Sequence, residues 1–221
     1  MHLTFSSNIR SPLIILDIGA HIGSHTLIYS HFLNCHVYAF EPQLLIYRLL
    51  VKNVQENNYI HGHLYPCAVG HQSMETTLSH RLYDGYNCEI EYDTHKIMNY
   101  GGIGLGQHGQ TVRMMTVDEL DLQQCDYMKI DVEGAEILVL LGRQKTIQSF
   151  QPLIWFECTD KTITEEMKTS LSLEEELPSV ETYLSSFGYH FQWIDTHNRL
   201  AWIPSKHEGF NEWLLNTNVY F

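Results

Sequence analysis

The segment LIILDIGAHIG, residues 13–23, decides the fold. Residues 13–18 form a largely apolar run rich in branched side chains, which is typical of a parallel strand buried on both faces. Gly19 and Gly23 follow at the point where such a strand turns into a helix, and the ligand-binding edge of a doubly wound sheet lies there. The segment therefore predicts a central strand with a ligand-binding turn at its carboxyl end.

Strand and helix patterns alternate beyond this segment. The expected elements are a helix over 23–33, a strand over 36–40, a helix from Pro42 to about 57, strands over 64–69 and 127–130, a helix over 135–150, a strand over 153–156, a helix over 178–187, and a hairpin of 190–194 and 200–203. This order predicts an α/β fold with a mainly parallel seven-stranded sheet, helices on both faces and a terminal antiparallel hairpin.

The 221 residues suit one domain, which we expect to span 1–221 with its cofactor-binding core at 13–157. Residues 70–110, rich in Gly, Tyr, His and Asn, predict an irregular excursion on the acceptor side. Residues 161–176 are polar and predict a solvated surface segment, and 178–221 hold the terminal helix and hairpin. Trp193 and Trp202 of that hairpin are expected in the core.

Composition narrows the choice of partners. The formal charge is −13, from 13 basic and 26 acidic residues, so nucleic acid and anionic membranes are poor partners. The sequence has no apolar run of the roughly 20 residues that a membrane span needs, and residues 1–11 lack the pattern of a signal peptide. Five scattered cysteines without a CxxC pair fit free thiols, so we expect a cytoplasmic protein. The sequence leaves the oligomeric state open.

The glycine spacing points to an adenosyl cofactor rather than a dinucleotide. It reads G-x-x-x-G, and His21 stands where a further glycine would let a pyrophosphate approach. A cofactor carboxylate would still fit the amides at the helix start, and Asp17 can face its ammonium group. Glu41 follows the second strand, 22 residues after Gly19, where an acidic side chain accepts hydrogen bonds from both ribose hydroxyls.

A second group of acids follows the later strands. Asp131 ends the strand over 127–130, Glu133 lies in the next turn, and Glu157 ends the following strand. Methyl transfer to an alcohol needs help with a proton of high pKa, which a carboxylate base or a bound cation provides. Asp131 and Glu157 would suit Mg²⁺ or Mn²⁺. Capping of a helix start is the alternative role for Glu133 and Glu136.

Three further side chains have two possible roles each. Lys129 lies on the strand face of Asp131, where an ion pair is the favoured role and a catalytic lysine the alternative. His21 and His25 stand four residues apart in the glycine loop, where a cofactor-lining or surface role is favoured over binding a metal.

Taken together, these segments resemble the FkbM-type methyltransferases, a family of Rossmann-like class I enzymes that depend on S-adenosylmethionine. The resemblance covers about residues 13–157 and is carried by ILDIGAHIGSHT (15–26), AFEP (39–42), AVG (68–70), TVDEL (116–120) and KIDVEGAE (129–136). It implies cofactor contacts at Asp17, Gly19, Ala20 and Gly23, within AFEP at Glu41 and Pro42, and on the adenine side at Ala68 and Val69. The family's loop usually has asparagine at the position of His21.

The resemblance implies O-methylation of a sugar or similar small molecule. The main hypothesis is such an enzyme with Asp131, and as a further candidate Glu157, at the reacting hydroxyl, with or without a metal. Two alternatives stay open: a catalytically silent adenosyl- or glycan-binding module, and an amine or protein methyltransferase. A nicotinamide-dependent oxidoreductase is disfavoured by the missing second glycine.

Overall fold

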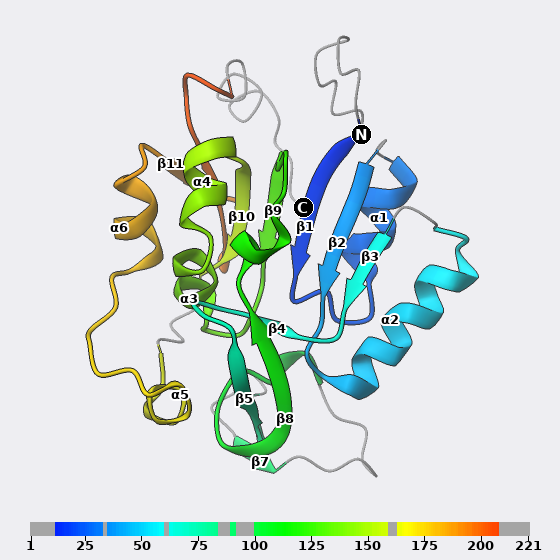
Figure 1. Ribbon diagram of the computed structural model, residues 1–221, viewed down its shortest axis with the longest axis vertical. Coiled ribbons are helices and arrows are strands. Elements are labelled where there is room, and N and C mark those ends of the chain that lie inside the picture. Colours follow the sequence, from blue (N-terminus) through cyan, green and yellow to red (C-terminus); the bar gives the residue numbers. More distant parts are fainter. Residues whose placement is uncertain are drawn as a thin grey trace.

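The computed structural model describes residues 12–32, 35–59, 62–83, 89–91, 100–158 and 163–207. Its main sheet has seven strands with β1 near the centre (Figure 1). From one edge to the other they are β11 (His190–Trp193), β12 (Asn198–Trp202), β10 (Leu153–Glu157), β9 (Tyr127–Ile130), β1 (Leu13–Ile18), β2 (Cys35–Phe40) and β3 (Gly62–Tyr65). The pairs from β10 to β3 are parallel, and β12 runs antiparallel to both of its neighbours. The predicted sheet and its terminal hairpin are confirmed.

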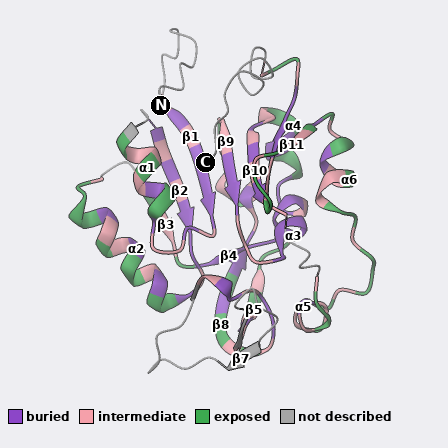
Figure 2. Cartoon of the chain, turned by 180° about the vertical axis from the view of Figure 1, so that it is seen from behind, coloured by how far each residue is buried: buried purple, intermediate pink, exposed green. Residues whose placement is uncertain are grey.

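Helices cover both faces of this sheet, as predicted. Because side chains alternate along a strand, Leu13 and Ile15 pack towards one face, whereas Leu16 and Ile18 pack towards the other. The first face carries α1 (Ser24–Phe32) and α2 (Leu44–Glu56); the second carries α3 (Glu136–Leu141), α4 (Gln144–Phe150) and α6 (Val180–Ser185) (Figure 1). The strands between these layers are mostly buried (Figure 2). No helix within the described ranges has the length and hydrophobicity to cross a membrane.

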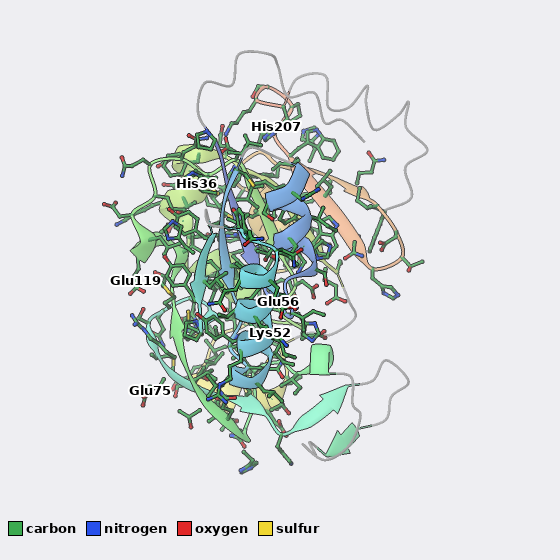
Figure 3. All side chains as sticks on the ribbon, turned by 90° about the vertical axis from the view of Figure 1, so that its right-hand side faces the viewer. His36, Lys52, Glu56, Glu75, Glu119 and His207 are labelled. Carbon is green, nitrogen blue, oxygen red and sulfur yellow. The ribbon has the colours of Figure 1, made fainter. Side chains whose placement is uncertain are left out.

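The sequence of helix α2 determines which of its faces is buried. Ile46, Leu50 and Val54 recur every four residues and are buried, whereas Lys52 and Glu56 form an exposed ion pair of 3.7 Å on the outer surface (Figure 3). The expectation that Pro42 lies in the first turn is wrong, because the helix begins at Leu44 with Gln43 as its N-cap residue. The amide of Gln43 donates to the Glu41 side chain, so the chain enters the helix only after this contact.

A second, three-stranded sheet lies beside the carboxyl edge of the main one (Figure 1). It consists of β4 (Ala68–Val69), β8 (His108–Met115) and β5 (Met74–Ser79). The predicted single strand over 64–69 is therefore wrong: β3 belongs to the main sheet and β4 to the small one. Pro66 separates them, and proline lacks the amide that a continuous ladder would need.

The prediction of an irregular excursion over 70–110 is also wrong. This part of the chain contains β5, β6 (Arg81–Tyr83), β7 (Glu89–Glu91), the 3₁₀ turn η1 (Tyr100–Gly102) and the start of β8, while residues 84–88 and 92–99 lie outside the described ranges. The alternation that marks β5 is short, with Thr76 and Leu78 buried and their neighbours more exposed. A buried threonine weakened the apolar pattern by which strands are recognised.

The predicted helix over 135–150 is two helices, α3 and α4, which are separated at Gly142 and Arg143. A Cβ atom on Gly142 would lie 1.9 Å from the carbonyl oxygen of Gly70, so only glycine allows the small sheet to approach. After the break, both oxygens of Asp118 in the 3₁₀ turn η2 (Val117–Leu120) accept amides at the start of α4. A long-range contact therefore interrupts a locally helical pattern.

Two expectations about which residues are exposed are wrong. The segment over 161–176 includes α5 (Glu165–Leu171), whose Met167 and Leu171 are buried against the small sheet; residues 161 and 162 lie outside the described ranges. The apolar pair at i and i+4 stands among many charges, which hid it. Trp202 is buried with 6% exposure, but Trp193 is 49% exposed and its ring lies 3.8 Å from the Arg199 guanidinium.

Candidate active site

The glycine loop between β1 and α1 turns sharply at the carboxyl edge of the sheet. Gly19 and Gly23 have φ values of +80° and +91°, which glycine adopts without strain. A Cβ atom on Gly19 would lie 1.8 Å from the carbonyl oxygen of Asp131. The amides of Gly19 and Ala20 both donate to the carbonyl of Phe40, at 3.1 and 2.9 Å. The loop is thereby fixed against the ends of β2 and β9.

Glu41 lies at the end of β2, where the sequence predicted a ribose-binding acid. Its two oxygens accept different amides: Oε2 that of His21 at 3.0 Å, and Oε1 that of Gln43 at 2.8 Å. The side chain is nearly buried, and this desolvation raises its pKa to about 7 against the opposing effect of the two hydrogen bonds. A carboxylate has about four lone-pair sites, so two remain for ligand hydroxyls.

A buried network of ion pairs connects the glycine loop after β1 with the end of β9. The ammonium of Lys129 lies 3.2 Å from Oδ2 of Asp131 and 3.6 Å from Oδ1 of Asp17, and it donates to the carbonyl of Gly19 at 3.0 Å. Asp17 is fully buried and also accepts the Thr26 hydroxyl at 2.6 Å. Burial alone would lower the pKa of Lys129, but Asp17 and Asp131 together raise it. The ion pair predicted for Lys129 and Asp131 is confirmed.

A cavity of about 300 Å³ lies beside this network, and both Glu41 and Asp131 line it. The predicted site residues that line it are Gly19, Ala20, His21, His25, Glu41, Pro42, Ala68, Val69, Lys129, Asp131 and Glu133. Asp17, Gly23 and Glu157 do not line it. Asp17 lies behind the loop, and Gly23 packs on α2, where a Cβ atom would lie 2.6 Å from Leu50 Cδ1. The predicted cofactor contacts of Asp17 and Gly23 stay predictions.

An apolar wall closes one side of this cavity, and the sequence did not predict its residues. Leu78 of β5 and Ile103 and Leu105 beyond η1 line the cavity together with Phe40 and Cys67. The only sequence signal was the pattern of apolar residues between the glycines at 101–106. An apolar slot beside the Glu41 carboxylate can hold a flat, weakly polar ring while the carboxylate binds an attached sugar.

The turn after β9 is held by Glu136. Its Oε1 accepts the amides of Val132 and Gly134, at 3.1 and 3.2 Å. Burial raises the pKa of Glu136 to about 7. Glu136 lies in the first turn of α3 as predicted, but the two amides precede the helix, and its N-cap residue Ala135 provides no side-chain cap; Glu136 therefore stabilises the preceding turn rather than the helix start. Glu133 lies in the same turn with a φ of +58° and lines the cavity instead.

Asp131, Glu133 and Glu157 come together as a possible ligand set for a cation. One oxygen of each lies within 4.8 Å of the others, and oxygen donors suit Mg²⁺ or Mn²⁺. Oδ2 of Asp131, however, already faces the Lys129 ammonium, whose positive charge repels a second cation and neutralises part of the cluster. The predicted divalent ion at Asp131 and Glu157 stays a prediction.

Sequence and structural comparisons agree on one family. A family model described as "Methyltransferase FkbM domain" matches residues 17–191. The hexuronic acid methyltransferase AglP of Haloferax volcanii is 28% identical over 140 residues, which cover 62% of this chain and 52% of that enzyme. The crystal structure of methyltransferase FkbM from Methylobacillus flagellatus aligns with a TM-score of 0.55 at 14% identity, over 86% of this chain and 43% of that one. The chain thus spans about half the length of these relatives.

Proposed function

The chain belongs to the FkbM family of S-adenosylmethionine-dependent methyltransferases, and we propose that it methylates a hydroxyl oxygen of a sugar or glycan. The observation that carries this proposal is that Glu41 and Asp131 line one cavity. Glu41 is prepared to accept hydroxyl hydrogen bonds, whereas Asp131 lies at the end of β9 with a partly exposed carboxylate. These two positions suit a ribose and a reacting hydroxyl, respectively.

When bound, S-adenosylmethionine supplies an electrophilic methyl carbon on a sulfonium sulfur. Glu41 would hold the ribose hydroxyls, and the wall of Leu78, Ile103 and Leu105 would exclude water from the adenine. Asp131 would accept a hydrogen bond from the reacting hydroxyl and so orient its oxygen towards the methyl carbon. Lys129 would act through Asp131 and the Gly19 carbonyl, because its ammonium is almost completely buried between them.

The acidity of the site supports a hydroxyl rather than a carboxylate acceptor. The curated relative acts on a hexuronic acid, which is a sugar with both kinds of oxygen. Here Asp131 and Glu133 line the cavity with Glu157 close to them, one oxygen of each within 4.8 Å of the others, and the nearby Lys129 already faces two carboxylates. An anionic carboxylate would be repelled at this place, whereas a neutral hydroxyl finds hydrogen-bond acceptors.

Calorimetric titration with S-adenosylhomocysteine, with NAD as the control, is the first test. Saturable binding of the thioether alone supports the proposal, and no binding in any condition would favour the silent module. A screen of hexuronides and neutral oligosaccharides with tritiated methyl donor then tests the acceptor. A methyl ether survives mild alkali and a methyl ester does not, so alkali-labile product would contradict the hydroxyl acceptor.

The metal prediction is tested in the same assays. Since the Lys129 ammonium already faces Asp131, we expect turnover to be the same after EDTA treatment and after addition of Mg²⁺ or Mn²⁺. Loss of turnover with EDTA and its recovery with Mg²⁺ would instead assign Asp131, Glu133 and Glu157 as metal ligands.

A further inference from the structure

His21 adopts a backbone conformation that few side chains tolerate. Its φ is +52°, in the left-handed region where asparagine, aspartate and histidine are enriched among non-glycine residues. This conformation directs its amide to Oε2 of Glu41 at 3.0 Å. The backbone amide of residue 21 therefore helps to position Glu41, and the amide of an asparagine in this conformation would do so equally well. This backbone contact does not explain why the side chain is an imidazole.

The ring lines the cavity and has an unused nitrogen. Nε2 of His21 is shielded from solvent, and none of the described residues forms a hydrogen bond with it. Buried polar atoms are normally paired, so this nitrogen is expected to meet a ligand atom. His21 and Asp131 line the same cavity, and Gly19, two residues before His21, packs against the backbone carbonyl of Asp131. Burial lowers the pKa of His21 below its usual value, with Asp131 opposing and Lys129 adding to the effect. A neutral imidazole has one nitrogen that accepts a proton.

Asp131 is a weaker candidate for the same proton. Its Oδ2 already pairs with the buried ammonium of Lys129 at 3.2 Å, whereas Nε2 of His21 has no hydrogen-bond partner among the described residues. Lys129 is held in place by Asp17 and by the carbonyl of Gly19. Asp131 is therefore suited to orient a hydroxyl and to stabilise a positive charge that forms on a neighbouring imidazole.

We propose that Nε2 of His21 accepts the proton of the acceptor hydroxyl during methyl transfer, an assignment that rests on the proposed function. The O–H bond breaks and its proton passes to Nε2, while the hydroxyl oxygen forms a bond to the methyl carbon. The C–S bond breaks and its electron pair stays on sulfur, so sulfonium becomes thioether. His21 is then a catalytic residue of this chain, and Asp131 stabilises the imidazolium.

The variants His21→Asn and His21→Gly test this assignment, because both residues tolerate the left-handed backbone and keep the amide that binds Glu41. We expect turnover to fall about 10²- to 10⁴-fold, as for loss of a general base, with affinity for S-adenosylhomocysteine within about threefold of the wild type. The matched control is His108→Asn: His108 is exposed, lies outside this cavity and has a φ of +66°. Unchanged turnover in the His21 variants would overturn the assignment. Loss of affinity with full turnover at saturating cofactor would also overturn it, since the ring would then be a cofactor contact.

The pH dependence of turnover provides a second test. It would not differ between the wild type and the variant if His21 had only a structural role. Turnover is measured at saturating cofactor, so that the titration of Glu41 does not contribute. The wild type is expected to lose turnover towards acid pH as the ring is protonated, and His21→Asn is expected to lack this limb. An identical acid limb in the variant would contradict the proposal.

Nitrogen NMR of histidine-labelled protein tests the ring without any acceptor. In the complex with S-adenosylhomocysteine at pH 7.5, Nε2 of His21 is expected to be unprotonated. A protonated Nε2 that donates to the cofactor would overturn the assignment while leaving the proposed function intact. If S-adenosylhomocysteine does not bind at all, the proposed function fails, and the assignment fails with it.

Discussion

Glu41 and Glu136 are two buried glutamates at the same edge of the sheet, and they differ in what they hold. Each accepts two backbone amides, and burial raises the pKa of each to about 7. Glu41 follows β2 and lines the cavity, whereas Glu136 stands behind the turn after β9 and does not. The same arrangement of a buried acid and two amides therefore leaves one glutamate at the cavity and lets the other fix the shape of the turn after β9. A buried acid at a strand end becomes a binding residue only where a cavity reaches it.

Under the proposed function, Glu41 and its neighbours determine the affinity for the cofactor, whereas Asp131 and its neighbours determine turnover. The Lys129 network joins these two groups of residues, because its ammonium contacts Asp17 and Gly19 on one side and Asp131 on the other. Substitutions in each group should therefore have separable effects.

The largest expected effect is on turnover in Asp131→Asn. Asparagine keeps the shape but removes the charge that orients the hydroxyl and stabilises the transition state, so turnover should fall about 10³-fold. Affinity for S-adenosylhomocysteine, measured by calorimetry, should stay within about threefold. Asp121→Asn, at an exposed position outside the cavity, is the matched control. Normal turnover in Asp131→Asn would remove this residue from the reaction.

The next largest effect is on affinity in Glu41→Ala. The variant loses the acceptor for both ribose hydroxyls, and hydrogen bonds to a charged group contribute about 1.5–3 kcal/mol each. We therefore expect affinity for S-adenosylhomocysteine to fall about 100-fold or more. Glu136→Ala removes the same number of backbone contacts but should change affinity by less than about threefold. Equal losses in the two variants would refute the division between the two groups of residues.

A smaller effect is expected from pH. The carboxylate form of Glu41 accepts the ribose hydrogen bonds, and its pKa in the free protein is about 7. Affinity should therefore rise with pH through 7 and level off above it, which amounts to about tenfold between pH 6 and pH 8. Calorimetry at several pH values measures this slope, and Glu41→Gln should flatten it. The same slope in Glu136→Gln would show that Glu136 does not contribute.

The sequence predicted the main sheet and the polar residues of the cavity, because these depend on local patterns. The strand before Gly19, Glu41 after the second strand and Asp131 after a later one are all recognisable from their neighbours. The small sheet and the apolar wall of Leu78, Ile103 and Leu105 were not predicted, since they depend on contacts between distant segments. The break at Gly142 has the same origin: its cause is the backbone of Gly70, which no local pattern reveals.

The smallest expected effect distinguishes the two glutamates by the atoms they use. In Glu136 a single oxygen, Oε1, accepts both amides, whereas in Glu41 each oxygen accepts one. Glutamine has one carbonyl oxygen, so Glu136→Gln can keep both hydrogen bonds, but Glu41→Gln must turn its amino group towards an amide donor. We expect Glu41→Gln to lower the free energy of unfolding by about 1–3 kcal/mol and Glu136→Gln to change it by less than about 1 kcal/mol at pH 7. A raised carboxyl pKa stabilises the fold below the unfolded pKa, and this contribution is lost as pH rises through about 7. In urea unfolding, the free energy of unfolding of Glu136→Gln should therefore rise relative to that of the wild type between pH 6 and pH 8. A constant difference between the two free energies over this range would mean that Glu136 does not titrate there.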